Sequence, residues 1–160
     1  EKMRAVPDSF VRTSVIVGHP GETDEDFAEM LSFIEGFDFD AVTVFEYSDE
    51  EGTTAYNRAQ KVDKKTVSKR LTAIKKVIAK KSAKKAKATV GSKFEAVFEG
   101  VSDEHEYLLK AKKKIWAPEI DGEILVNESE VENPVVGRLY KMTATDAAKD
   151  KVIARIDGVA

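Results

Sequence analysis

The chain contains no cysteine, and this absence removes several kinds of chemistry at once. Without thiols, its residues can form no disulfide, no thiolate nucleophile and no cysteine-ligated zinc or iron–sulfur site. The two histidines, His19 and His105, lie far apart in sequence and lack the spacing of metal ligands. Any metal chemistry must come from residues outside these 160, so we assign no metal ligand and no catalytic residue in this chain.

Long apolar runs are also missing. No stretch approaches the roughly 18–20 apolar residues that span a bilayer, and the first residues lack the apolar segment of a signal peptide. The composition, 42% apolar and 34% charged, is typical of a soluble globular protein. We therefore expect a cytoplasmic location. The chain does not begin with Met and enters a strand pattern directly, which predicts that it is a fragment of a longer protein.

The net charge of −3 hides three segments of different character. Residues 1–61 carry 5 basic and 14 acidic side chains, residues 62–88 carry 11 basic and 1 acidic, and residues 89–160 carry 10 basic and 14 acidic. Charge blocks of this kind mark physically different parts of a chain. We therefore predict three parts with these bounds.

The first part has the pattern of a strand, a helix and a second strand. Residues 12–18 are a β-branched run that ends at glycine, which is typical of a buried parallel strand. Thr23 and Asp26 form a variant capping box, and apolar residues at helical spacing extend the helix over residues 24–36. Residues 40–45 predict the second strand of a parallel βαβ unit. Such a unit cannot bury both faces of its sheet, so it indicates a slice of a larger α/β fold.

The second part predicts a long basic helix. Val67, Leu71, Ile74 and Ile78 recur on one side, while the lysines and Arg70 fill the remaining faces. Lysine clusters neutralise phosphates, but a lysine run opposite an apolar stripe is more often a solvated face. No aromatic residues are interleaved for base stacking. Ribosomal association stays open.

From about residue 92 the apolar period changes to two. Five short strand candidates, with turn residues between them, predict a small OB-like antiparallel β-barrel. They lie at residues 94–100, 107–111, 123–126, 136–142 and 151–156. The fold class is therefore α/β plus all-β.

Three stretches resemble a known family. Residues 12–23 (RTSVIVGHPGET) resemble the fifth-strand signature of radical-SAM methylthiotransferases, and residues 44–55 (VFEYSDEEGTTA) resemble their sixth strand and its exit loop. Residues 117–122 (APEIDG) resemble a loop of the appended TRAM domain. The branch most similar is the RimO type, which modifies a ribosomal protein. The resemblance implies the C-terminal slice of a radical-SAM, partly TIM-like barrel, then a basic connecting helix and a TRAM domain.

The expected activity follows from this resemblance alone. Members of the family use a 4Fe-4S cluster to cleave S-adenosylmethionine into a 5′-deoxyadenosyl radical, and a second 4Fe-4S cluster handles the inserted sulfur. The RimO branch places a methylthio group on the β-carbon of an aspartate in the twelfth small-subunit ribosomal protein. All cluster cysteines are absent here, so we expect this segment to be inactive alone.

The resemblance also implies a cofactor site at the strand ends. Val17, Gly18, Phe45 and Tyr47 are expected to border the adenine of S-adenosylmethionine, where α/β barrels place their ligands. Gly18 leaves room for close approach, and Ile16 or Val17 can pack against a ring. An ordinary strand–turn–helix connection with core packing would use the same residue types.

The acidic excess of residues 89–160 favours a basic partner, because like charges repel a polyanion. We therefore expect the TRAM domain to bind the ribosomal protein. Separately, we expect the methylthiotransferase to be a monomer. Trp116 is assigned to core packing rather than to an exposed anchor. Two alternatives stay open, a transfer-RNA methylthiotransferase of the same family and a non-enzymatic OB-type binding module.

Overall fold

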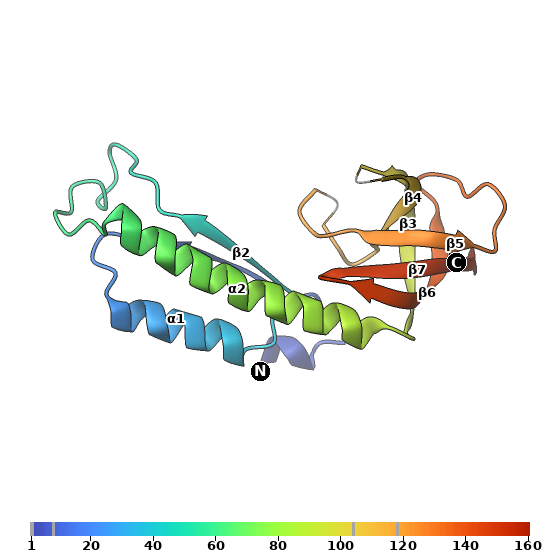
Figure 1. Ribbon diagram of the computed structural model, residues 1–160, viewed down its shortest axis with the longest axis horizontal. Coiled ribbons are helices and arrows are strands. Elements are labelled where there is room, and N and C mark those ends of the chain that lie inside the picture. The colour runs from blue at the N-terminus through green and yellow to red at the C-terminus, as the bar shows by residue number, and fades with distance from the viewer. Residues whose placement is uncertain (1, 8, 104, 118) are drawn as a thin grey trace. The chain divides into compact units, whose positions relative to one another are not determined.

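The computed structural model describes residues 2–7, 9–103, 105–117 and 119–160 (Figure 1). The chain divides into two compact units, one of Val11–Lys81 and one of Glu1–Phe10 with Ser82–Ala160. The elements in order are η1 (a 3-10 helix, Lys2–Ala5), β1 (Arg12–Val17), α1 (Asp24–Gly36), β2 (Ala41–Glu46), α2 (Lys64–Thr89), β3 (Lys93–Ser102), β4 (His105–Lys113), β5 (Ile124–Ser129), β6 (Leu139–Ala148) and β7 (Lys151–Val159).

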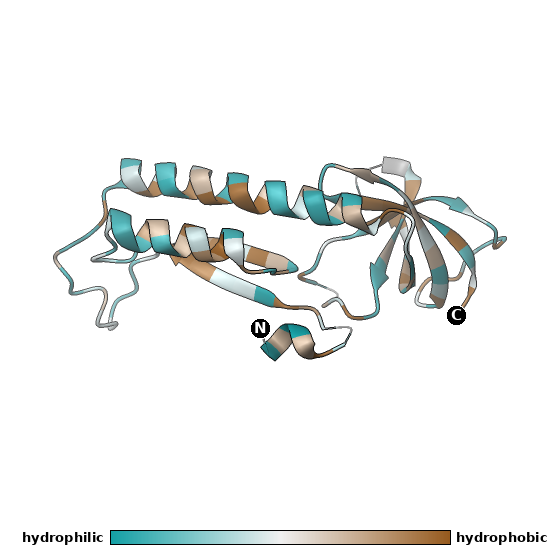
Figure 2. Cartoon of the chain, turned by 90° about the horizontal axis from the view of Figure 1, so that it is seen from below, coloured by the Kyte–Doolittle hydropathy of each residue, from teal (hydrophilic) through white to brown (hydrophobic). Residues whose placement is uncertain are grey.

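In the unit Val11–Lys81, strands β1 and β2 form a two-stranded parallel sheet, as the βαβ pattern predicted. Helices α1 and α2 pack on one face of this sheet (Figure 1). Figure 2 shows apolar bands alternating with polar ones along both helices. Val17, Ile34, Val67 and Ile74 are the buried centre of the core between the helices and the sheet. The opposite face of the sheet has no helix on it within this unit.

Helix α1 begins and ends where the sequence placed it. Thr23 is its N-cap, and the capping box with Asp26 is complete in both directions. Helix α2 begins two residues later than expected, at Lys64, and ends at Thr89. Gly91 follows with a φ of 86°, a left-handed conformation that glycine adopts without strain.

Strands β3 to β7 close into a barrel in the order β3-β4-β5-β7-β6. The predicted five-stranded barrel is confirmed, but the prediction that all its strands pair antiparallel is wrong for one pair. Strands β5 and β7 pair in parallel, with Ile124 opposite Val152. The physical reason is parity, because strand directions can alternate all the way around a ring only if the number of strands is even. A closed barrel of five strands must contain a parallel pair.

The fourth barrel strand, β6, begins at Leu139 rather than at the predicted Val136. Gly137 has a φ of 83°, and its N–H donates to the Phe98 carbonyl oxygen at 2.8 Å. This turn holds the preceding residues out of the strand.

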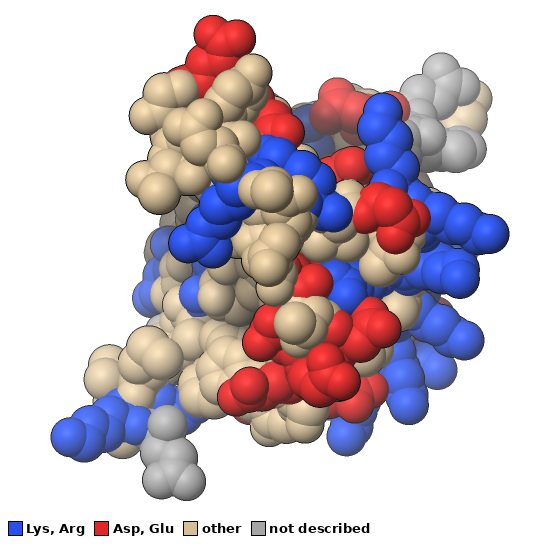
Figure 3. Space-filling model, turned by 90° about the vertical axis from the view of Figure 1, so that its left-hand side faces the viewer, with Lys and Arg blue, Asp and Glu red and all other residues tan. Residues whose placement is uncertain are grey.

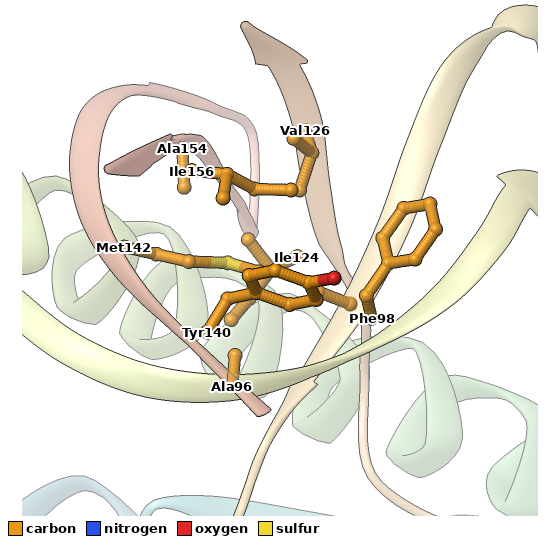
Figure 4. Close-up of a cluster of buried hydrophobic side chains, with 9 residues drawn as sticks. Ala96, Phe98, Ile124, Val126, Tyr140, Met142, Ala154 and Ile156 are labelled. Carbon is orange, nitrogen blue, oxygen red and sulfur yellow. The ribbon is translucent and has the colours of Figure 1, made fainter. Parts of the chain in front are cut away.

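The barrel has its own apolar core, built from inward-facing residues of all five strands (Figure 4). Tyr140 is the largest of the fully buried side chains. Its hydroxyl oxygen accepts a hydrogen bond from the Val135 N–H at 2.8 Å, so the phenol is buried without loss of its polar partner. Trp116 packs against this core, which confirms its assignment to core packing.

Candidate functional site

The carboxyl ends of β1 and β2 lie at the same edge of the sheet, because the two strands are parallel. Val17 is opposite Glu46 in the register, and the Val17 carbonyl oxygen accepts from the Tyr47 N–H at 2.9 Å. The turn after β1 and the loop after β2 therefore meet. The structure brings Val17, Gly18 and Tyr47 together at this edge and places Phe45 next to Ile16 across the strand pair.

The two faces of the sheet differ at this edge. The side chain of Val17 is fully buried in the core beneath α2. Ile16 and Phe45 point to the other face, and each is 52% exposed. Of the two residues that the sequence offered for packing against a ring, Ile16 therefore has an accessible side chain, whereas Val17 can offer its backbone. Contact between these residues and a cofactor stays a prediction.

Gly18 is required by the packing of α2. Its φ is 88°, and a Cβ atom at this position would lie 2.7 Å from Cγ2 of Val67. The space beside Gly18 is thus taken by the helix. Its N–H donates to Oε2 of Glu22 at 3.0 Å, which fixes the turn between β1 and α1.

Glu22 is bound in turn by Arg70 of α2, and this pair is the main electrostatic feature of the site. The Glu22 and Arg70 side chains are 9% and 7% exposed. One Arg70 guanidinium nitrogen donates to Oε1 of Glu22, and the other donates to Oδ1 of Asp24 at 2.6 Å. The prediction that Arg70 lies on a polar outer face of the helix is wrong. It lies inside the unit because a planar guanidinium can bind two carboxylates at once.

The surroundings of Arg70 keep it charged. Burial acts to lower the pKa of Arg70, but the hydrogen bonds to Asp24 and Glu22 outweigh it and raise the pKa above its ordinary value. The guanidinium also lies over the ring of Phe27, 5.5 Å from the ring centroid. Among the described residues, the Nε atom of Arg70 has no hydrogen-bond partner.

The loop after β2 is organised around Tyr47. The ring of His19, a residue to which the sequence assigned no role, lies 5.4 Å from the Tyr47 ring in an edge-on arrangement. The Tyr47 hydroxyl donates to Oδ1 of Asp49 at 2.9 Å, and the Lys61 ammonium lies 5.6 Å from the Tyr47 ring centroid. Partial burial raises the pKa of Tyr47, and the bond to Asp49 raises it further. The phenol therefore stays neutral and acts as a donor near pH 7.

Sequence reasoning missed Arg70 and Lys61 as contributors to this edge. One signal was available, because Arg70 is the only arginine among the 11 basic residues of residues 62–88. An arginine in a lysine-rich helix indicates a position where fork geometry matters. The partners of Lys61 in the loop had no such signal.

The loop at residues 117–122 is closed by Asp121. Its side chain accepts from the Ala117 N–H at 2.7 Å, and its own N–H donates back to the Ala117 carbonyl oxygen at 3.0 Å. Pro118, which belongs to the stretch that resembles a TRAM loop, lies outside the described residues. No group of three potential metal-ligating side chains and no helix long and apolar enough to cross a membrane occurs in the part of the chain that the structure describes.

Comparison with known families identifies the domain that the barrel forms. The family model of the TRAM domain matches residues 90–156, which include all five barrel strands except the end of β7. The chain contains a TRAM domain. The match begins just after α2, so the TRAM domain and the basic helix are separate features of the sequence.

Three relatives extend the similarity beyond the TRAM domain, and each is named ribosomal protein uS12 methylthiotransferase RimO. The identity is 46% over 96% of this chain in Nitratiruptor sp., 43% over 96% in Aliarcobacter butzleri and 45% over 98% in Wolinella succinogenes. These relatives confirm the resemblance to methylthiotransferases of the RimO type. The chain spans 35% of the length of each of the three.

Proposed function

We propose that this chain is a segment of a radical-SAM methylthiotransferase that adds a methylthio group to the β-carbon of an aspartate in ribosomal protein uS12. The observation that carries the proposal is similarity at 43–46% identity to proteins named for this activity, over 96–98% of the chain. Because a ribosomal protein is the proposed substrate, we place the protein in the cytoplasm. We also propose that it is a monomer.

The edge formed by the ends of β1 and β2 is the proposed cofactor-binding part of the segment. S-adenosylmethionine, when bound, supplies the radical chemistry and the methyl group. Two accessible apolar side chains, Ile16 and Phe45, fit an adenine ring. Glu22 accepts a hydrogen bond from the Gly18 N–H, and the Tyr47 N–H donates to the Val17 carbonyl oxygen. The residues present do not fit the two 4Fe-4S clusters, because the chain has no cysteine, and no step is assigned to the clusters here.

A binding experiment on the longer protein tests this edge. Replacing Ile16 or Phe45 by Ala removes apolar contact area and should weaken S-adenosylmethionine binding by roughly tenfold, on the order of one buried side chain. Val101→Ala is the control, because Val101 is 55% exposed on the barrel unit, away from this edge in sequence and in unit. Equilibrium dialysis with labelled S-adenosylmethionine gives the dissociation constant. Unchanged affinity in both edge variants would remove the edge from the cofactor site.

The TRAM domain is the proposed docking surface for uS12. Glu128, Glu130 and Glu132 are exposed in and after strand β5, within a segment of net negative charge. Ribosomal proteins are strongly basic, so opposite charges steer the two together.

Titration of the full chain with purified uS12 tests the docking. We expect binding at low salt that weakens as salt rises, because contacts between exposed charges are screened. The variant E128Q/E130Q/E132Q should bind more weakly, whereas D146N/D150N/E119Q, which neutralises three exposed acidic residues elsewhere on the unit, should not. No measurable affinity at low salt contradicts docking through this domain. If the chain binds transfer RNA in a gel-shift experiment more tightly than it binds uS12, the transfer-RNA alternative is favoured.

A further inference from the structure

The outer side of helix α2 carries a row of lysines that neither the cofactor edge nor the TRAM domain uses. Lys65, Lys69, Lys76 and Lys80 follow one another in steps of 4, 7 and 4 residues. An 11-residue period returns to nearly the same side of an α-helix, so the four side chains lie along one line, which we call the lysine stripe. All four belong to the unit Val11–Lys81 and precede the TRAM match.

The lysine stripe is exposed and has no counter-charge of its own. All four residues are exposed, and none of the four ammonium groups has an ion-pair partner within the described part of the chain. Two other basic residues of the same helix behave differently. Arg70 is buried against Glu22, and the Lys81 ammonium donates to backbone carbonyls of α1. The cations that stabilise the fold are thus distinct from those of the stripe.

An ordinary solvated helix face does not account for this arrangement. Surface helices intersperse acidic residues, since oppositely charged i,i+4 pairs are favourable and like pairs repel. Helix α2 contains no acidic residue, although the chain has 29. Lys65 and Lys69, and also Lys76 and Lys80, are like-charged i,i+4 pairs. Figure 3 shows basic side chains gathered along one flank, on the right in this view, with acidic side chains gathered beside them. Binding of an external polyanion would relieve the repulsion along the stripe.

We propose that the lysine stripe binds the phosphate backbone of RNA without reading its sequence. The stripe runs over the 16 residues from Lys65 to Lys80, and its ends are about 22 Å apart along the helix axis, enough for several consecutive phosphates. It contains no arginine and no aromatic side chain, so it offers charge but neither bidentate base contacts nor stacking. The choice of RNA rests on the proposed function, because a ribosomal protein is surrounded by RNA once it is assembled.

The test compares two variants of the full chain with equal charge change. K65Q/K69Q/K76Q/K80Q removes the stripe, and K75Q/K93Q/K141Q/K149Q removes four exposed lysines that lie off it. Binding of a fluorescently labelled, mixed-sequence RNA duplex is followed by anisotropy from about 50 mM to 200 mM salt, where phosphate contacts lose affinity steeply. Circular dichroism checks that α2 remains helical in both variants.

We expect the stripe variant to lose at least about tenfold in affinity at low salt, and its plot of log K against log salt to flatten by up to about 0.9 per lysine removed. The control variant should keep most of its affinity at low salt and most of its salt dependence. The proposal is overturned if the chain binds no RNA at low salt, if both variants lose affinity equally, or if polyglutamate competes as well as RNA does. None of these readouts requires methylthiotransferase activity, so failure here is separable from failure of the proposed function.

Discussion

At the scale of single residues, the stretch from Val17 to Glu22 is held together by contacts that sequence similarity does not reveal. Gly18 is a glycine because Val67 fills the adjacent space and because its φ is positive. Glu22 connects the Gly18 N–H to Arg70, a residue 48 positions away in sequence. The geometry of this edge therefore depends on helix α2.

Replacing Arg70 tests that dependence. Arg70→Met leaves the buried Glu22 carboxylate without its cation, and removing one partner of a buried ion pair costs about 3–5 kcal/mol. Lys69→Met, at the neighbouring exposed position, should change stability by no more than about 0.5 kcal/mol. Urea denaturation gives both free energies of unfolding. Equal effects of the two substitutions would show that the ion pair does not stabilise the unit.

Gly18→Ala should also destabilise the unit. The new Cβ atom would stand 2.7 Å from Val67 Cγ2, and the backbone would keep a left-handed conformation that costs an L-residue about 1–2 kcal/mol. Adding Val67→Ala relieves the clash but not the backbone strain, so the double variant should lose less stability than the two single losses added together. Thermal denaturation of the three variants measures this coupling, and strict additivity would contradict it.

Asp157 makes part of the barrel's stability dependent on pH. Burial acts to raise the pKa of Asp157, but hydrogen bonds from Thr143 and Arg155 outweigh it and leave the pKa lowered. A lowered folded-state pKa stabilises the fold above the ordinary value of about 3.9, and this contribution is lost as the pH falls through the folded-state pKa. Asp157→Asn should therefore be less stable than the parent at neutral pH and closer to it around pH 3. Chemical denaturation at both pH values measures the difference, and a constant gap would contradict the assignment.

At the scale of elements, Lys81 of α2 binds the end of α1. The Lys81 ammonium donates to the carbonyl oxygens of Ile34, Glu35 and Phe37 at 2.5, 2.9 and 2.6 Å. These are carbonyls that the end of a helix leaves without intrahelical partners, and a cation there also matches the helix dipole.

Adjacent lysines provide a matched test of this cap. Lys81→Met removes charge-assisted hydrogen bonds worth about 1.5–3 kcal/mol, and the last turn of α1 should exchange its amide hydrogens faster. Lys80→Met removes the same charge from an exposed position and should leave that exchange unchanged. Hydrogen-exchange NMR of residues 33–37 distinguishes the two. Faster exchange in both variants would point to net charge rather than to capping.

At the scale of the whole molecule, the two units differ in how completely their sheets are covered. The barrel is closed, whereas the sheet of β1 and β2 has only two strands and is packed by helices on one face. Two-stranded sheets are marginally stable unless other elements cover them. The relatives are about three times as long as this chain, which spans 35% of their length.

Hydrogen exchange should reveal this difference. We expect the amides of β1 and β2 to open with a smaller free energy than those of β6 and β7, because opening exposes less apolar surface in the smaller sheet. Mass spectrometry of peptides from residues 12–17, 41–46, 139–148 and 151–159 measures the protection. Equal protection in the two units would contradict the expectation.

Much of the fold follows from local sequence patterns. The capping box at Thr23, the glycine after α2 and the two apolar periods determine where the helices and most strands lie. The start of β6 was predicted too early because the apolar alternation in the sequence begins before the turn at Gly137, whereas the strand begins after it. At the candidate site, the sequence located the edge but left open whether Ile16 or Val17 was accessible. That distinction depends on which face the helices cover.

The sequence by itself determined the order of elements, the blocks of charge and the similarity to RimO-type proteins, because each depends on residue identities along the chain. Only the tertiary structure decided that β5 and β7 run parallel, that Arg70 is buried with Glu22, and that Lys81 caps α1. These features join segments far apart in sequence. Their energies come from closure of the barrel, burial and ion pairing, which exist only after the chain has folded.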